Sequence, residues 1–318
     1  MDGVGLVLAG GGGKGAYQIG VWKALIEMNI AQNITAVSGT SVGALNAALF
    51  AHGDYEVAEM IYKNIRHEQI LTLGKSDLFK IAANFMKSNN IVMSLYGGKS
   101  KSFFTREGMI DIINDYIDLK KLSSSSIKCF ATCHDIFRAK PCYFNLNGQT
   151  DSKIIDILLA SSALPAIFEP VTIDGVTYYD GGISDNVPVL PLYNNGYKVI
   201  IIVHLDRGSY IDKRLFPNAT LIQIVPKESQ GDLITGTLDF SKEGALTRMR
   251  QGYEDAIDIF KHLKQINDTG NRMLAVLESM RADNKETVSE VADQIREINT
   301  LKEEARSLSA QGDSKWKK

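Results

Sequence analysis

Ser41 is the residue of this sequence best placed to act as a nucleophile. It stands in Gly39-Thr40-Ser41-Val42-Gly43, a G-x-S-x-G pattern between a run that predicts a strand and a run that predicts a helix. Such a turn exposes the serine hydroxyl, and its glycines are needed because a Cβ would clash where strand and helix approach closely. The pattern therefore predicts a nucleophile elbow. Taken alone, it is also compatible with a small-residue turn that only packs a helix on a sheet.

A glycine-rich run, Gly10-Gly11-Gly12-Gly13-Lys14-Gly15, follows the first predicted strand and opens the first predicted helix. A phosphate-binding P-loop would need Ser or Thr after the lysine, and here Gly15 follows. A dinucleotide fold would need an acid at the end of the second strand, where this chain has Gly39 to Gly43 instead. These two interpretations therefore fail.

A third interpretation uses both glycine motifs. In a parallel sheet the turns after the first and second strands open on the same edge, so the glycine run would lie beside Ser41. Its backbone N–H groups, at a helix N-terminus, can then stabilise the oxyanion formed when Ser41 attacks a carbonyl. The donors expected for this oxyanion hole are Gly11, Gly12 and Gly13.

The serine also needs a base. Of the five histidines, only His204 and His262 could complete a triad in the chain order Ser–Asp–His, and His204 ends a buried strand, where a purely structural role is commoner. Asp180 offers a different base, because it leaves a predicted hairpin and precedes Gly181 and Gly182. Its carboxylate would be a weak base at its ordinary pKa, so we expect burial to raise that pKa. The alternative for Asp180 alone is a simple Asp-Gly turn.

Together and in this order, the three motifs resemble those of the patatin-like phospholipase family. Residues 10–15 resemble its G-G-G-x-[RK]-G motif, residues 39–43 its G-T-S-x-G elbow, and residues 180–182 its D-G-[GA] motif. The runs at 160–168 and 186–188 are also similar to the family. One departure is Ala9, where many members have Asp before the glycines. The resemblance covers about residues 4–225.

The resemblance implies a three-layer α/β/α fold and a Ser–Asp dyad that works without histidine, metal or cofactor. Ser41 would be the nucleophile, Asp180 the general base, and the N–H of Lys14 a further oxyanion donor. The implied activity is lipid acyl hydrolysis of the phospholipase A or lysophospholipase type, on phospholipid or lysophospholipid at a transiently contacted membrane surface. Two alternatives remain: a soluble carboxylesterase that acts on small esters, and an inactive lipid-binding module with the same fold.

The elements that must position these residues can be predicted from hydrophobic patterning. Residues 199–203 are apolar on both faces, which is typical of a parallel strand buried between helices. Residues 171–178 predict a hairpin with Asp174-Gly175 as its turn. Further strands are expected at 4–9, 34–38, 127–132, 142–145 and 220–225, with helical patterns between them, so we predict an α/β domain with a mostly parallel sheet.

The chain changes character near residue 240. We predict a catalytic domain over 1–240 and a helical C-terminal extension over 241–318, which either packs back on the domain or serves regulatory or self-association contacts. Residues 74–106 stand apart as an apolar insertion with six basic residues and one acid. That composition is compatible with a lid facing a lipid surface or with an ordinary helix that has a solvated basic face.

Composition excludes several other classes. With 44% hydrophobic and 23% charged residues among 318, the chain can form a core, and its net charge of −2 argues against a nucleic-acid partner. Three cysteines are too few for a disulfide scaffold, and the spacing of Cys129, Cys133, His134 and Cys142 matches no common zinc module. No apolar run is long enough to span a bilayer and no signal peptide is evident, so we expect a cytoplasmic protein, peripheral to membranes at most.

Overall fold

The computed structural model describes residues 3–64, 106–165 and 167–313. The chain divides into two compact units, Met1–Ile259 and Phe260–Lys318. The predicted insertion at 74–106 lies outside the described residues except for Arg106, so the lid hypothesis stays a prediction. None of the helices in the described part of the chain has the length and hydropathy of a bilayer-spanning segment.

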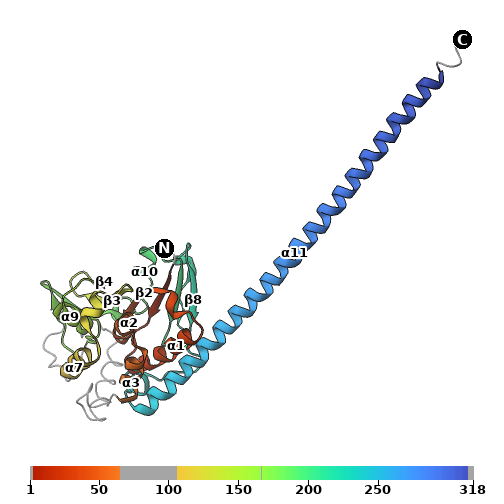
Figure 1. Ribbon diagram of the computed structural model, residues 1–318. Coiled ribbons are helices and arrows are strands. Elements are labelled where there is room, and N and C mark those ends of the chain that lie inside the picture. The colour runs from red at the N-terminus through yellow and green to blue at the C-terminus, as the bar shows by residue number, and fades with distance from the viewer. Residues whose placement is uncertain (1–2, 65–105, 166, 314–318) are drawn as a thin grey trace. The chain divides into compact units, whose positions relative to one another are not determined.

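The first unit is built on an eight-stranded sheet with the order β5-β6-β3-β2-β1-β7-β8, and β4 pairs with β3 (Figure 1). The five strands from β3 to β8 in this order are all parallel, whereas β4 and the β5–β6 hairpin pair antiparallel. The predicted α/β class with a mostly parallel sheet is therefore confirmed. The strands are β1 (Val4–Leu8), β2 (Ile34–Thr40), β3 (Lys128–Asp135), β4 (Lys140–Asn145), β5 (Val171–Ile173), β6 (Val176–Asp180), β7 (Val199–Val203) and β8 (Thr220–Ile224).

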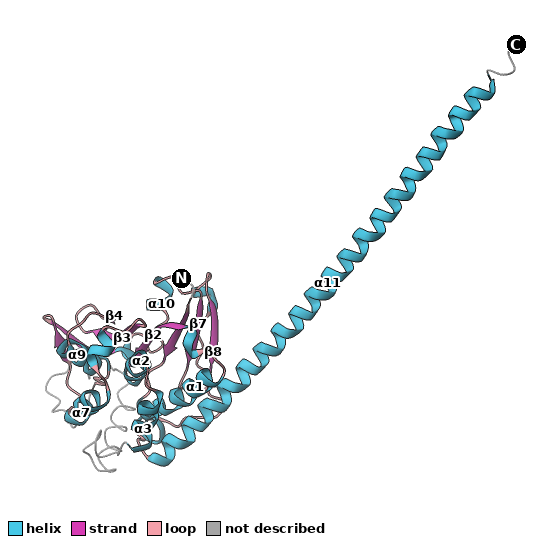
Figure 2. Ribbon diagram, viewed as in Figure 1, coloured by secondary structure: helices cyan, strands magenta, loops and turns pink. Residues whose placement is uncertain are grey.

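Helices connect and cover these strands (Figure 2). The α-helices are α1 (Ala16–Glu27), α2 (Val42–His52), α3 (Tyr55–Asn64), α7 (Glu107–Tyr116), α8 (Leu119–Ser123), α9 (Asp151–Ser161), α10 (Leu190–Asn194) and α11 (Lys242–Asp313). A π-helical turn, η5, spans Leu233–Thr237, and a short 3-10 helix, η1, spans Gly12–Gly15.

Both faces of the sheet are covered, as the strand alternation requires. On β1, Leu6 and Leu8 pack with Ile19, Trp22 and Phe50 of helices α1 and α2. Val7 points to the other face, where it joins a cluster with residues of β7, of α10 and of the chain beside them: Val189, Leu192, Tyr197, Ile200 and Ile202. The predicted three layers are thus present, and the sheet is their common core.

Strand β3 brings two chain segments end to end. It pairs with β4 along one edge over residues 130–135, so β2 and β6 must share its other edge. On that edge Thr132 pairs with Thr40, the last residue of β2, and the next residue, Cys133, pairs with Asp180, the last residue of β6. The carboxyl ends of β2 and β6 therefore meet head to head.

Helix α11 begins at Lys242, close to the predicted domain boundary at 240, and its residues 242–259 belong to the first compact unit. This part packs against α1 through two glycines. A Cβ on Gly20 would collide with the Met249 carbonyl, and one on Gly252 with the Tyr17 carbonyl. Beside this contact the Tyr17 hydroxyl donates to Asp255 Oδ2 at 2.9 Å, with both side chains buried.

The contact at Gly20 can be tested by a substitution to alanine. The stability change expected from the packing is opposite to the one expected from helix propensity. Alanine is normally preferred over glycine in a helix by about 1 kcal/mol. We nevertheless expect Gly20→Ala to lower the free energy of unfolding by about 1–3 kcal/mol, because the added methyl group meets a backbone carbonyl that has no room to move. Urea denaturation measures this change. Ser279→Ala, at an exposed helical position, serves as the control, and a Gly20→Ala protein more stable than wild type would contradict the packing.

Candidate active site

Ser41 lies on a strained turn between β2 and α2. Its backbone has φ 56° and ψ −126°, a conformation that costs a non-glycine residue on the order of 1–3 kcal/mol. The turn is possible only because Gly39 and Gly43 lack side chains. A Cβ on Gly39 would strike the Gly43 carbonyl, and one on Gly43 would strike the carbonyls of Leu8 and Ala9. The predicted elbow is therefore present, with the side chain of Ser41 at the wall of a pocket.

Asp180 lies next to this serine. The carboxylate accepts a hydrogen bond from the Gly182 N–H at 2.8 Å, and the Ser41 hydroxyl acts on it as a hydrogen-bond partner that lowers its pKa. The residue is only 3% exposed. Gly181 is required here, because a Cβ at that position would meet the Thr132 carbonyl. The structure thus brings Ser41 and Asp180 together, 139 positions apart in the chain, and among the described residues neither side chain has a histidine as a hydrogen-bond partner.

Burial controls the ionisation of Asp180. Removal from water raises its pKa from 3.8 to about 6, and the hydrogen bonds from Ser41 and Gly182 only partly oppose this rise. A carboxylate with a pKa near 6 is still ionised at neutral pH and is a stronger base than an ordinary aspartate. This is the direction of shift that we predicted for a catalytic base.

The glycine run abuts the serine. A Cβ on Gly10 would lie 3.3 Å from the Ser41 Cβ, and Gly10, Gly11 and Gly12 line the same pocket as Ser41. Within the described residues, no hydrogen bond uses the N–H groups of Gly11, Gly12 or Gly13. Gly13 is buried and does not line the pocket, and Gly15 packs under Val42 and Tyr62.

Lys14 differs from its neighbours in this loop. Its N–H donates to the Gly11 carbonyl at 3.2 Å, so it is engaged inside the loop and is not open to the pocket, unlike the further donor that we expected. Lys14 lines the pocket together with Asp206, and its Nζ lies 2.6 Å from Asp206 Oδ1. The side chain of Lys14 is 8% exposed and that of Asp206 is 57% exposed, so the acid is the partner on the solvent side.

Three contacts fix the glycine loop from outside. Asn186 holds Gly10 from both sides, because its carbonyl accepts the Gly10 N–H at 3.1 Å and its Nδ2 donates to the Gly10 carbonyl at 3.2 Å. Positions where Gly12 and Gly13 would carry a Cβ are occupied by the carbonyls of Thr237 and Asp239. The loop is therefore held between two later parts of the chain, Asn186 and the segment that carries Thr237 and Asp239.

Buried side chains hold both supports in place. Arg248 of α11 donates from Nη2 to the Thr235 carbonyl at 2.7 Å and to Asp239 Oδ2 at 2.8 Å. On the other side, Asn46 Nδ2 donates to the Gly15 carbonyl at 3.1 Å, and Asn46 Oδ1 accepts from the Tyr62 hydroxyl at 3.0 Å. Gln18 completes this network with a 2.7 Å bond from Nε2 to the Ala9 carbonyl.

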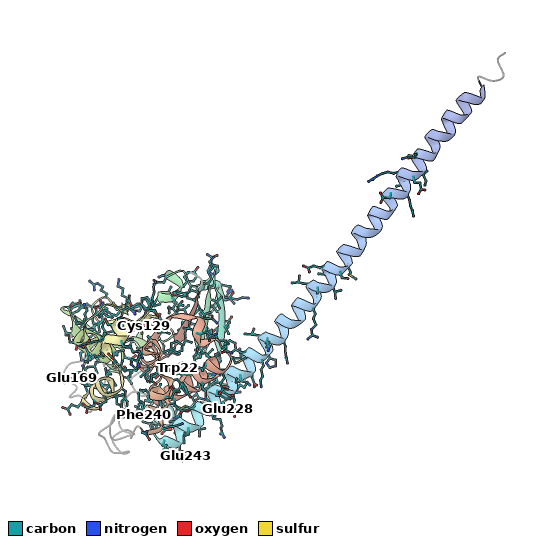
Figure 3. The ribbon with its side chains drawn as sticks, viewed as in Figure 1. Trp22, Cys129, Glu169, Glu228, Phe240 and Glu243 are labelled. Carbon is teal, nitrogen blue, oxygen red and sulfur yellow. The ribbon has the colours of Figure 1, made fainter. Side chains whose placement is uncertain are left out.

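The pocket beside Ser41 and Asp180 has a volume of about 360 Å³ and walls that are mostly apolar. Its polar lining includes Ser41, Asp180, Asn46 and Tyr62, whereas its apolar walls come mainly from α2, α3, α7 and residues near Leu164 and Phe240. Figure 3 labels one of these wall residues, Phe240. The apolar lining consists of Val42, Leu45, Leu49, Ile61, Met109, Ile112, Ile113, Ile117, Leu164, Ile167, Phe168, Leu238 and Phe240.

The other candidate residues lie away from this pocket. His204 is buried with Nδ1 2.9 Å from Ser209 Oγ and Nε2 2.9 Å from Gln223 Oε1, and burial lowers its pKa. Cys129 and Cys133 are buried in β3, where burial raises the pKa of each thiol. Among the described residues, no group of three or more His, Cys, Asp or Glu side chains is placed to hold a metal ion.

Sequence reasoning did not identify several residues that shape the site. Ser161 and Asn186 fall within runs that we noted as family-like, but their roles depend on hydrogen bonds to segments far along the chain. Arg248 and the walls from α7 and η5 carry no local pattern that distinguishes them from ordinary helix residues. Only the three-dimensional fold assembles them around the glycine loop.

Comparison with known proteins gives the family. The model of the patatin-like phospholipase family matches residues 6–193, and the chain therefore belongs to this family. An uncharacterised NTE family protein of Mycobacterium tuberculosis is 26% identical over 203 residues, which cover 64% of this chain and 49% of that protein. Lysophospholipase NTE1 of Cryptococcus neoformans is 28% identical over 225 residues, which cover 66% of this chain and 11% of that protein.

The chain spans about half the length of the mycobacterial relative and a small part of the fungal one. Among solved structures, VipD from Legionella pneumophila is similar with a TM-score of 0.49 and 15% identity, over 82% of this chain and 67% of that chain.

The raised pKa of Asp180 predicts a stability change with a definite sign. Because the pKa in the folded state is above its unfolded value, ionisation of Asp180 destabilises the fold at pH values above about 6, and this cost vanishes below about pH 4. We expect Asp180→Asn to raise the free energy of unfolding at pH 8 by on the order of 3 kcal/mol, since a neutral amide avoids that cost. At pH 4 the difference from wild type should largely disappear.

Denaturant titrations at pH 4 and pH 8 measure this difference. Asp174→Asn, at an exposed turn, is the matched control and should show little pH-dependent gain. If Asp180→Asn is no more stable than wild type at pH 8, the carboxylate is not held ionised against a burial penalty.

Proposed function

We propose that this protein is a lipid acyl hydrolase in which Ser41 and Asp180 form a catalytic dyad. One observation carries the proposal: the Ser41 hydroxyl is a hydrogen-bond partner of a buried carboxylate of raised pKa, and both residues line a mostly apolar pocket. Membership of the patatin-like phospholipase family supports a lipid ester as substrate. The proposed localisation is cytoplasmic, with transient contact at a membrane surface where the substrate resides.

In the proposed acylation step, Ser41 Oγ attacks the ester carbonyl while Asp180 accepts its proton. The carbonyl oxygen acquires negative charge. The proposed hydrogen-bond donors to this oxygen are the N–H groups of Gly11 and Gly12, because both residues line the pocket. Gly13, in η1, would add a third N–H. Asp180 then returns the proton to the leaving alcohol. The carbon–oxygen ester bond breaks, and an acyl-Ser41 intermediate remains.

Deacylation repeats these roles with water. Asp180 accepts a proton from a water molecule that attacks the acyl-serine carbonyl, and the released Ser41 oxygen recovers a proton from Asp180. Fatty acid leaves, and the dyad returns to its starting ionisation state. The family resemblance implies no metal or cofactor in either step.

The pocket supports a fatty-acyl substrate. Its thirteen apolar side chains can cover a hydrocarbon chain, and its polar lining includes Ser41, Asp180 and the Lys14–Asp206 pair. A phospholipid or lysophospholipid would place its acyl chain among the apolar residues and its polar remainder toward this ion pair. One relative is named a lysophospholipase, which is compatible with such a substrate.

Release of fatty acid from lysophospholipid tests the dyad. We expect Ser41→Ala and Asp180→Asn each to lower kcat/KM by about 1000-fold or more, because each removes a group that takes part in both chemical steps. A fluorophosphonate probe should label the wild type and fail to label Ser41→Ala. Full activity of either variant would refute the dyad.

The pH dependence of the wild type is a separate test. The base must be ionised to accept a proton, so kcat/KM should fall tenfold per pH unit as the pH drops below about 6. Asp185→Asn provides a control, since it changes a carboxyl near the site that does not line the pocket. A profile that stays flat down to pH 4.5 would show that Asp180 does not serve as the base.

The length of the acyl chain distinguishes a lipid hydrolase from a small-ester carboxylesterase. Leu45 lines the pocket on α2, and we expect Leu45→Trp to obstruct it. Activity on esters with sixteen-carbon chains should fall at least about tenfold more than activity on four-carbon esters, because only the long chain needs the part of the pocket that the tryptophan side chain fills. Leu263→Trp, at an exposed position outside the pocket, is the control. Equal losses for both esters would favour the carboxylesterase.

A further inference from the structure

Ser161 connects the backbone of the nucleophile to the strand that carries the base. Its Oγ accepts the Ser41 N–H at 3.0 Å and donates to the Thr132 carbonyl at 2.7 Å. The residue is the last of α9 and is fully buried. A single hydroxyl therefore satisfies one donor and one acceptor from two different elements, at 120 and 29 positions from itself in the chain.

The Thr132 carbonyl, which accepts the hydrogen bond from Ser161, belongs to the part of β3 where β2 and β6 meet. Thr132 pairs with Thr40, the residue before Ser41, and its neighbour Cys133 pairs with Asp180. The Thr132 carbonyl also occupies the space where Gly181 would carry a Cβ. The hydrogen-bond chain from Ser41 through Ser161 thus ends against the turn that follows Asp180.

The contact is also placed where the backbone is strained. Ser41 has a positive φ of 56°, and a serine held in that region tends to relax unless surrounding groups prevent it. The ladder of β2 ends at Thr40, so it does not fix the Ser41 N–H. Ser161 supplies the partner for this N–H, and it is a side chain that a substitution can remove.

We infer that Ser161 is a positioning residue of the dyad, which holds the Ser41 hydroxyl in line with Asp180 without touching the substrate. This inference rests on the proposed function, since it concerns the same serine and carboxylate. Without Ser161, the elbow can turn toward a relaxed backbone, and the hydroxyl then moves away from the carboxylate. A displacement of about 1 Å at a reacting group can reduce the rate about 100-fold.

The consequence for Asp180 distinguishes positioning from a purely structural role. The hydrogen bond from Ser41 lowers the pKa of Asp180 against the larger effect of burial. If that bond weakens, burial acts with less opposition and the pKa rises above about 6. The acidic limb of the pH–rate profile should then move to higher pH, which a general loss of stability would not cause.

The experiment compares Ser161→Ala with Ser161→Thr and with Ser38→Ala in the full chain, using hydrolysis of lysophosphatidylcholine. Ser38 is a matched control because it is also fully buried and its hydroxyl donates to a backbone carbonyl, that of Pro188, at 2.6 Å. For Ser161→Ala we expect kcat to fall about 10- to 100-fold, KM to stay within about twofold, and the acidic limb to rise by about half a pH unit or more. Ser161→Thr keeps the hydroxyl and should restore the wild-type limb.

The possible outcomes distinguish a positioning role of Ser161 from a purely structural one. If Ser161→Ala loses stability as Ser38→Ala does and its acidic limb stays at the wild-type pH, Ser161 is only a structural residue and the inference is wrong. If Ser161→Ala does not fold, Ser161→Cys takes its place, and its weaker hydrogen bonds should still raise the limb. Ser41→Ala runs in parallel, because an active Ser41→Ala protein would refute the proposed dyad itself, whatever Ser161 does.

Discussion

The hydrogen bond between the Ser41 hydroxyl and the Asp180 carboxylate is the interaction on which the rest of the site depends. A carboxylate can act as a base for serine only if it is kept from water, since a solvated aspartate holds a proton too weakly. Burial provides the required pKa, but it also destabilises the ionised fold. A more basic Asp180 therefore comes with a less stable fold, and interactions elsewhere in the structure must offset this loss of folding free energy.

The arrangement of strands in the sheet brings Ser41 and Asp180 together. Because β2 and β6 share one edge of β3, their last residues meet end to end, and the turn after each strand opens at the same point. The glycines at 39, 43 and 181 then remove every side chain that would keep the backbones apart. Their role is steric, and only at Gly12 of the neighbouring loop does a positive φ add a conformational reason.

Much of this arrangement could be predicted from the sequence. The apolar runs at 4–9, 34–38 and 199–203 correspond to β1, β2 and β7, and the Asp174-Gly175 turn joins β5 and β6. The motifs located Ser41, Asp180 and the glycine loop because their chemistry requires particular residues at short spacing. The engagement of the Lys14 N–H was not foreseen, since whether a loop N–H points inward or outward depends on the turn that the loop adopts.

The residues that sequence reasoning missed act over long chain separations. Asn186 holds Gly10 across 176 positions, and the chain from Arg248 through Thr235 and Asp239 reaches Gly12 and Gly13 from beyond the part that carries the motifs. The glycine loop at 10–15 is therefore supported in part by Arg248, which lies after residue 240. The predicted boundary at residue 240 separates Arg248 from the loop that it supports, whereas residues 242–259 belong to the first compact unit.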